Sequence, residues 1–197
     1  MMSHKYYLIL NPFSGKKHGR KILSRILPAL KEARCELVHH ETVSPGGAES
    51  FIKQADFTGF TGVIIVGGDG TMHEVINGML KRKDKQLLPL GLVPAGTGNA
   101  FLQDLKLLDP MAVVRRIISG NTRALDIIKI SQGNHICYSF NVLGFGLAAD
   151  ITALACRLGW LGPLRYNIAA IIEILIHKNR ISEITYDSVN FKGTIEF

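Results

Sequence analysis

Short apolar runs alternate along the first part of the chain with segments whose apolar residues recur at helical spacing. A short apolar run bounded by turn signals predicts a buried strand, and an apolar repeat every three to four residues predicts an amphipathic helix. The predicted strands are residues 6–10, 36–40, 63–66 and 88–93, and the predicted helices are residues 20–33, 48–55, 71–80 and 110–119. This alternation predicts an α/β fold built on a Rossmann-like, doubly wound parallel sheet.

The pattern changes after residue 122, where strand-like segments follow one another in pairs. The first pair flanks Gly133-Asn134, which is typical of a β-hairpin turn. The paired segments are residues 125–130 with 136–142 and residues 180–187 with 191–197, and a helical stretch over residues 149–177, interrupted at 159–163, lies between the pairs. We therefore predict an α/β domain over residues 1–122 and an antiparallel β domain with a helical insertion over residues 123–197. Because the pattern stops within a strand, we expect this β domain to be truncated.

Three of the predicted strands end in glycine-rich turns, at residues 11–20, 67–71 and 94–101. Glycine lets a backbone approach an anion closely, and the free N–H groups and dipole of a helix start favour negative charge. The central turn is Gly67-Gly68-Asp69-Gly70-Thr71, in which Thr71 stands where we expect a helix N-cap. Since the carboxyl ends of parallel strands share one edge, the three turns indicate a phosphate site there.

Asp69 is the unexpected residue of the central turn. A carboxylate repels phosphates unless it holds a metal ion or takes a proton. The combination indicates phosphoryl transfer, in which positioning and charge neutralisation provide most of the catalysis. The alternative interpretation, a tight turn between a strand and a helix, is less consistent with three such turns on one edge.

Composition narrows the function classes only slightly. The 197 residues are 47% hydrophobic and carry a net charge of +7, which suits nucleotides or anionic membranes. Basic residues do not interleave with aromatic ones, so we do not expect a nucleic-acid partner. The three cysteines, Cys35, Cys137 and Cys156, are far apart, which favours a reducing compartment over disulfides or zinc.

The most apolar stretch, residues 168–176, is too short to cross a bilayer and predicts an ordinary core helix. The first residues have no secretory signal pattern. We therefore expect a cytoplasmic protein, peripherally associated with a membrane.

Three motifs match a known family in order and spacing: Asn11-Pro12-x-Ser14-Gly15, Gly67-Gly68-Asp69-Gly70-Thr71 and Pro94-x-Gly96-Thr97-Gly98-Asn99. Together they resemble the diacylglycerol kinase catalytic-domain superfamily, which includes bacterial lipid kinases and eukaryotic sphingosine and ceramide kinases. The central motif alone is shared with NAD kinases and phosphofructokinases. Ala100 after Gly98-Asn99, and the segment 140–150, are more similar to the sphingosine-kinase-like branch.

The resemblance implies an ATP-dependent lipid kinase that uses Mg²⁺ and phosphorylates a lipid hydroxyl of a sphingoid base or diacylglycerol. It implies Asp69 as the catalytic residue. The implied nucleotide contacts are Asn11, Ser14, Thr42, Gly68, Gly70, Thr71, Gly98, Asn99, Arg157 and Arg165. Metal ligands are not assigned to any residue, and a homodimer is left open.

By the same resemblance, Asp150 matches a residue that binds the lipid head group, as a carboxylate would for a cationic amino alcohol. The alternative for Asp150 is a helix N-cap, since a helical stretch follows it.

Family members continue well beyond residue 197, so we expect this chain to be a fragment, a truncated product or a degraded relative. The alternative functions are therefore a soluble-substrate kinase of the NAD-kinase type and a non-catalytic nucleotide- or lipid-binding module.

Overall fold

The computed structural model describes residues 4–144, 146–176, 180–187 and 189–195. The chain divides into two compact units, one up to Asn141 and one from Val142 onward. Each unit is described by itself below.

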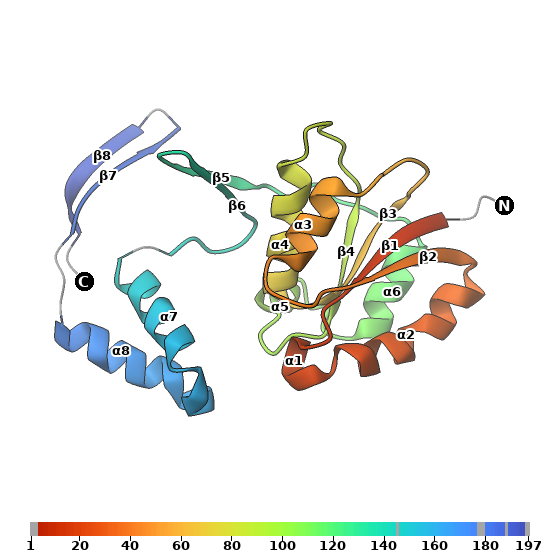
Figure 1. Cartoon of the computed structure of the whole chain (residues 1–197), viewed down its shortest axis with the longest axis horizontal. Coiled ribbons are helices and arrows are strands. Elements are labelled where there is room, and N and C mark those ends of the chain that lie inside the picture. The colour runs from red at the N-terminus through yellow and green to blue at the C-terminus, as the bar shows by residue number, and fades with distance from the viewer. Residues whose placement is uncertain (1–3, 145, 177–179, 188, 196–197) are drawn as a thin grey trace. The chain divides into compact units, whose positions relative to one another are not determined.

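The first unit is built on a parallel sheet of four strands in the order β2-β1-β3-β4 (Figure 1). The strands are β1 (His4–Leu10), β2 (Cys35–Glu41), β3 (Gly62–Gly67) and β4 (Leu90–Pro94). Every neighbouring pair is parallel. All six residues of β3 are buried, as expected for a strand covered on both faces.

Helices cover both faces of this sheet. They are α1 (Ser14–Lys17), α2 (Gly19–Glu32), α3 (Gly47–Gln54), α4 (Asp69–Leu80), α5 (Ala100–Asp104) and α6 (Pro110–Ile118). Alternate residues of β1 point to opposite faces, so Leu8 packs with α2 and α6 while Ile9 packs with α3 and α4. The predicted doubly wound α/β fold is confirmed.

The sheet has a topological switch point between β1 and β3. The chain leaves β1 through α2 on one face and leaves β3 through α4 on the other. Ligands of such sheets bind in the crevice outside the carboxyl ends of the strands at this point. The turns that follow β1 and β3 are two of the three glycine-rich turns.

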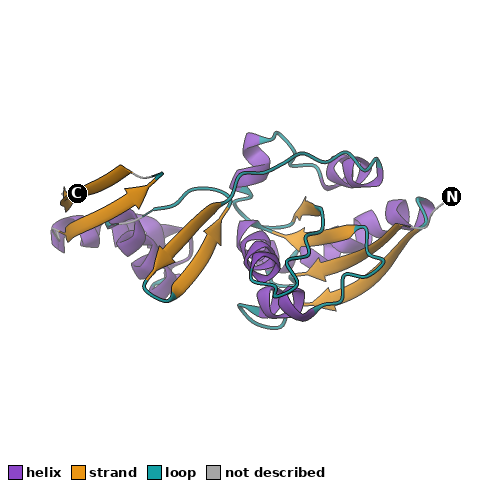
Figure 2. Cartoon of the chain, turned by 90° about the horizontal axis from the view of Figure 1, so that it is seen from above, coloured by secondary structure: helices purple, strands orange, loops and turns teal. Residues whose placement is uncertain are grey.

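A β-hairpin also belongs to the first unit. It consists of β5 (Ile128–Gln132) and β6 (His135–Ser139), and Figure 2 shows it as a ribbon separate from the four-stranded sheet. The Asn77 side chain binds it to α4, with Nδ2 donating to the Tyr138 carbonyl at 2.8 Å and Oδ1 accepting from the Tyr138 N–H at 3.0 Å. The compact unit therefore extends past residue 122, where the sequence places a domain boundary.

The second unit has a helical part and a strand pair. The elements are α7 (Leu147–Arg157), the 3-10 helix η1 (Gly159–Leu164), α8 (Arg165–Ile176) and the antiparallel strands β7 (Arg180–Tyr186) and β8 (Val189–Ile195). The antiparallel strands and the helical insertion are as predicted over the described residues, and residues 177, 196 and 197 of the predicted segments lie outside them. Throughout the residues that the structure describes, the helices are too short or too polar to cross a membrane.

The prediction that residues 168–176 form an ordinary core helix is wrong for this structure. Ala169 is the residue that α8 buries, whereas Ile171 and Leu175 are 60% and 79% exposed. The helix is apolar around most of its circumference, and its contacts within the unit are with α7 and η1. Most of its apolar surface therefore faces outward.

Candidate functional site

The three glycine-rich turns meet at the carboxyl edge of the sheet, with their backbones nearly in contact. A Cβ built at Gly15 would lie 2.1 Å from the Ala95 carbonyl oxygen, and Gly15 has a φ of +54°. A Cβ at Gly96 would lie 2.8 Å from the Gly68 Cα. Only glycine fits at these positions, so the glycines permit the three turns to form one surface of backbone groups.

The first and second turns are joined across the switch point by Asn11. Its Nδ2 donates to the Thr71 hydroxyl at 3.1 Å, and its Oδ1 accepts from the Phe13 N–H at 3.0 Å. Its own N–H donates to the Val66 carbonyl at 3.0 Å. Asn11 thus joins the first turn to the second, and it also accepts hydrogen bonds from the N–H groups of Phe13 and Ser14 within its own turn.

The prediction that Thr71 is an N-cap is wrong. Helix α4 begins at Asp69 with Gly68 as its N-cap, and the cap has no side-chain hydrogen bond. Thr71 lies inside the first turn, 5% exposed, where its hydroxyl accepts from Asn11. The turn is tighter than predicted because Gly67 lets the Thr71 side chain pack directly on the preceding strand.

The second and third turns are joined by the Asp69 carboxylate. Its Oδ2 accepts from the Ala100 N–H at 2.8 Å and its Oδ1 from the Phe101 N–H at 3.3 Å. These N–H groups open α5, so the carboxylate lies at the positive end of a short helix. Its orientation is fixed by backbone donors 31 and 32 residues further along the chain.

Asn99 shapes the third turn so that α5 can start there. It has left-handed backbone angles, with φ 51° and ψ 43°. Its side chain accepts from the Gly96 N–H at 3.1 Å and donates to the Gly96 carbonyl at 2.9 Å. Asparagine tolerates this conformation because its short polar side chain bonds locally.

The remaining predicted residues of the first unit lie on or beside the same turns. Ser14 and Thr42 are buried, and the Thr42 N–H donates to the Leu10 carbonyl at 2.9 Å, which places Thr42 at the end of β1. A Cβ at Gly98 would lie 3.8 Å from the Asp69 Oδ2, and Gly70 faces open space. The structure therefore brings together Asn11, Ser14, Thr42, Gly68, Asp69, Gly70, Thr71, Gly98 and Asn99.

Asp150, Arg157 and Arg165 belong to the second unit, so their roles stay predictions. Asp150 lies in the first turn of α7, whose N-cap is Gly146, and the interpretation of Asp150 as the N-cap is wrong. Arg157 ends α7, and Arg165 begins α8 with its guanidinium carbon 5.0 Å from the centre of the Tyr166 ring.

Two features of the site were not found from the sequence. Helix α5 was missed because it has five residues, too few for a periodic signal. The Ala100 and Phe101 N–H groups that hold Asp69 were missed with it. The one available signal was the Gly98-Asn99 turn, which is typical of a backbone reversal before a helix.

The site offers backbone and side-chain donors for phosphate but few ligands for a metal. Among the residues that the structure describes, three or more His, Cys, Asp or Glu side chains do not come together in a geometry that could hold an ion. Mg²⁺ is often bound by one or two carboxylates plus substrate phosphates. Asp69 and the glycine turns fit such an ion arriving with a nucleotide, and do not fit a protein-only metal cage.

Comparison with known proteins agrees with this geometry. Sphingosine kinase 1 of Arabidopsis thaliana is 35% identical over 182 residues, which are 87% of this chain and 37% of the plant protein. Diacylglycerol kinase of Bacillus subtilis (strain 168) is 30% identical over 192 residues, 95% of this chain and 61% of the bacterial protein. A diacylglycerol kinase structure from Bacillus anthracis str. Sterne shares the fold, with a TM-score of 0.70, 24% identity and coverage of 98% of this chain and 62% of that one.

The chain thus spans between about a third and two thirds of the length of these relatives. The model of the diacylglycerol kinase catalytic domain matches residues 5–130, which include all three glycine turns and end within the hairpin strand β5. On this match, the chain belongs to the diacylglycerol kinase catalytic domain family.

Proposed function

We propose that this chain carries the catalytic part of an ATP-dependent lipid kinase, which transfers the γ-phosphoryl group of ATP to a lipid hydroxyl. The observation that carries the proposal is the Asp69 carboxylate, held between two glycine turns at the switch point of the sheet. Its acceptor lipid is a sphingoid base or diacylglycerol, the substrates named for the relatives.

In this proposal the first unit binds the nucleotide phosphates. The binding groups are the backbone and side chains of Asn11, Ser14, Gly68, Gly70, Thr71, Gly98 and Asn99, with Thr42 beside the nucleotide. Mg²⁺ offsets the phosphate charge when it is bound. Residues 1–122 form the nucleotide-binding domain, and residues 123–197 begin the lipid-binding β domain, whose first hairpin belongs to the same compact unit as the nucleotide-binding domain.

Asp69 has the role of positioning the attacking group. Its carboxylate accepts a hydrogen bond from the lipid hydroxyl and takes that proton as the oxygen bonds to the γ-phosphorus and the β–γ bridging bond breaks. The two backbone donors keep the carboxylate in one orientation, so little reorganisation is needed during transfer.

The second unit contributes to both substrates. Arg157 and Arg165 bind nucleotide phosphates, and Asp150 accepts hydrogen bonds from the lipid head group. A cationic amino group on that head group would pair with the Asp150 carboxylate, which favours a sphingoid base.

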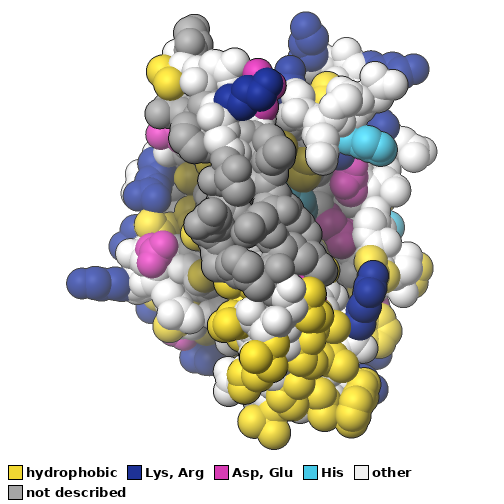
Figure 3. All heavy atoms as spheres, turned by 90° about the vertical axis from the view of Figure 1, so that its left-hand side faces the viewer, with side chains coloured by type: hydrophobic (Ala, Val, Ile, Leu, Met, Phe, Trp, Pro, Cys, Tyr) yellow, Lys and Arg dark blue, Asp and Glu magenta, His cyan; other side chains and the backbone are white. Residues whose placement is uncertain are grey.

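A peripheral membrane contact completes the proposal. Hydrophobic side chains gather in one patch at the level of α7 and α8 (Figure 3). We call it the α7–α8 surface, because its residues belong to η1, which links α7 to α8, and to α8 itself: Trp160, Leu164, Tyr166, Ile171, Ile174, Leu175 and Ile176. Trp and Tyr suit the interface between water and lipid, and the net charge of +7 suits anionic head groups.

The test is phosphate transfer from labelled ATP, measured on this chain and on any longer native form. The acceptors are sphingoid bases, ceramide, diacylglycerol, monoacylglycerol and NAD. Transfer to a lipid supports the proposal, and sphingoid-base transfer supports the Asp150 role. Transfer to NAD alone, or nucleotide binding without transfer by either form, would contradict it.

The matched variant for this assay is Asp69→Asn. We expect loss of turnover by about a hundredfold or more, because the amide cannot take the proton, with ATP affinity close to that of the unmodified chain. The amide accepts only one of the two backbone hydrogen bonds, so we expect the unfolding free energy to fall by about 1 kcal/mol. Turnover retained in Asp69→Asn would remove Asp69 from the mechanism.

A further inference from the structure

The β5–β6 hairpin is tied to the helix that carries Asp69. Asn77 lies two turns after Asp69 on α4 and is 1% exposed. Its amide donates to the His73 carbonyl at 2.9 Å and to the Tyr138 carbonyl at 2.8 Å, and accepts from the Tyr138 N–H at 3.0 Å. Every polar atom of this buried side chain therefore has a backbone partner, which fixes β6 against α4.

The same strand reaches the helix that holds the Asp69 carboxylate. Phe140 follows β6, is 9% exposed, and packs edge to face on Phe101 with the ring centroids 5.3 Å apart and an interplanar angle of 86°. Such a geometry is favourable for two aromatic rings. Phe101 belongs to α5, and its N–H is one of the two donors to Asp69.

These contacts form a closed chain of interactions that begins and ends on α4, the helix of the candidate catalytic carboxylate. Asn77 of α4 bonds Tyr138, the backbone leads from Tyr138 to Phe140, the Phe140 ring packs on Phe101, and the N–H groups of α5 bond Asp69 at the start of α4. We call Asn77, Tyr138, Phe140 and Phe101 the Asp69 brace. Helix α5 has only five residues, so it depends on packing for its position.

We infer that Phe140 is a positioning residue for Asp69, acting through Phe101 and the start of α5. This inference deepens the proposed function and rests on it for its kinetic consequence. The Phe140 ring holds α5 so that the Ala100 and Phe101 N–H groups stay on the Asp69 carboxylate. The hairpin thereby serves the reaction although it contributes no group to it.

The test compares Phe140→Leu with a matched control, Phe57→Leu. Phe57 is 4% exposed and belongs to the same hydrophobic cluster, but it packs on Tyr7 and Arg82. Both substitutions remove one buried ring, so both lower the unfolding free energy. Only Phe140→Leu removes the contact with α5.

The first readout needs no turnover. Amide proton shifts and exchange rates of Ala100 and Phe101 are measured by NMR on the whole nucleotide-free chain. We expect Phe140→Leu to speed exchange of both amides by about tenfold, since local opening governs exchange. A shift change alone reflects the lost ring current of Phe140 and does not count as support. Phe57→Leu leaves both amides as they are. Unchanged exchange of these amides in Phe140→Leu would overturn the inference, whatever the activity.

The second readout is kinetic. We expect Phe140→Leu to lower kcat by about tenfold to a hundredfold with the KM for ATP within about threefold, because a small misplacement of a catalytic group is costly. Phe140→Tyr, which keeps the ring, restores most of kcat. Equal kcat losses in Phe140→Leu and Phe57→Leu would overturn the inference. If the unmodified chain transfers no phosphate, the kinase proposal fails. The NMR comparison still decides whether Phe140 keeps the Ala100 and Phe101 N–H groups on the Asp69 carboxylate.

Discussion

Gly15 is the residue whose lack of a side chain the candidate site most depends on. Its φ is +54°, and a Cβ would meet the Ala95 carbonyl oxygen at 2.1 Å. Gly59 also has a positive φ, +76°, but its Cβ would meet no atom within 4 Å. Substitution of either glycine therefore tests the strain of a left-handed backbone, whereas only substitution of Gly15 also tests the close approach of two turns.

We expect Gly15→Ala to impair nucleotide binding and Gly59→Ala to spare it. Both substitutions cost about 1–2 kcal/mol of unfolding free energy for the left-handed backbone. Gly15→Ala must also push the first and third turns apart, which we expect to weaken ATP binding by about tenfold or more. Titration calorimetry with ATP and urea unfolding measure the two effects. Equal ATP affinity in the two variants would show that the turns can separate without harm to the site.

The sequence identified most residues of the site because their types are dictated by local backbone needs. Glycine at a close approach and asparagine at a turn are local requirements, so the three motifs were recognisable in the sequence. What holds Asp69 was not recognisable, because Ala100 and Phe101 contribute only backbone N–H groups. A backbone N–H donor does not restrict the type of residue at its position, and the Asp69 carboxylate that it bonds lies about 30 residues away in the sequence.

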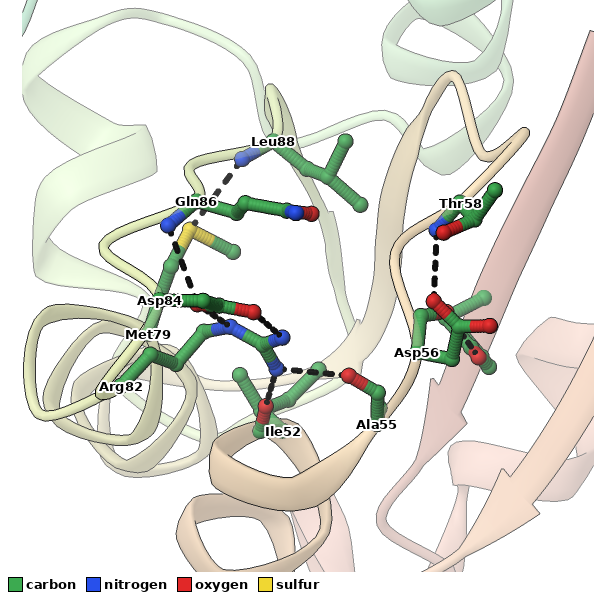
Figure 4. A network of polar contacts seen from close by, with 10 residues as sticks. Ile52, Ala55, Asp56, Thr58, Met79, Arg82, Asp84, Gln86 and Leu88 are labelled. Carbon is green, nitrogen blue, oxygen red and sulfur yellow. Dashed lines mark hydrogen bonds and ion pairs between the residues drawn. The ribbon is translucent and has the colours of Figure 1, made fainter.

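At the scale of elements, α3 and α4 are joined by one buried arginine (Figure 4). Arg82 follows α4 and its Nη1 donates to the carbonyls of Ile52 and Ala55, at 2.6 and 2.7 Å. These carbonyls close α3, where helix carbonyls lack helical partners. The other edge of the guanidinium binds Asp84, through Nε at 2.9 Å and Nη2 at 2.5 Å. The Phe57 ring lies 3.8 Å from the guanidinium carbon.

This arrangement predicts that acid weakens the contact by which Arg82 and Asp84 link α3 to α4. Hydrogen bonding from Arg82, together with the Gln86 N–H, holds the pKa of Asp84 below its ordinary value of 3.8. A carboxyl whose folded pKa is depressed stabilises the fold fully above its unfolded pKa, and that contribution is lost as pH falls through the folded pKa. We therefore expect the unfolding free energy to begin to fall below about pH 4, where Asp84 of the unfolded chain takes a proton, and to keep falling until the folded carboxylate is also protonated.

Urea unfolding at pH 6 and pH 3 measures this effect in Asp84→Asn. The variant should start less stable at pH 6 and lose less stability on acidification than the unmodified chain. Glu32→Gln, at an exposed position on α2, is the charge-matched control and should retain the full acid loss. The same acid loss in Asp84→Asn as in the unmodified chain would contradict the role of this pair.

The order and type of the long elements could be predicted, since each carries a repeat of its own. Strands β1, β3 and β4 are largely buried runs, and α2, α4 and α6 show helical spacing. The extent of the first unit could not be predicted, because the hairpin joins it through the Asn77 amide and the Phe140 ring, whose contacts form only in the fold. The exposure of α8 was equally unpredictable, since an apolar stretch does not say what packs on it.

At the scale of the whole molecule, the α7–α8 surface exposes more apolar side chains than is usual for helices that face water. Trp160 and Leu175 are each 79% exposed, and Leu164 and Ile171 are each 60% exposed. Contiguous apolar patches of this kind mark contacts with proteins or membranes. The net charge of +7 favours an anionic bilayer as the partner.

We therefore expect the chain to bind vesicles of a neutral and an anionic phospholipid, and Leu175→Ser to weaken that binding by about tenfold, since each buried CH₂ contributes about 0.8 kcal/mol. The matched control is Leu87→Ser, because Leu87 is 63% exposed but belongs to the first unit. Both leucines are exposed, so neither change should disturb folding. Vesicle sedimentation measures the binding, and sedimentation velocity without lipid measures self-association. Equal vesicle binding by the two variants would contradict the membrane contact. A dimer that Leu175→Ser dissociates while vesicle binding is unchanged would assign the surface to a second copy of the chain.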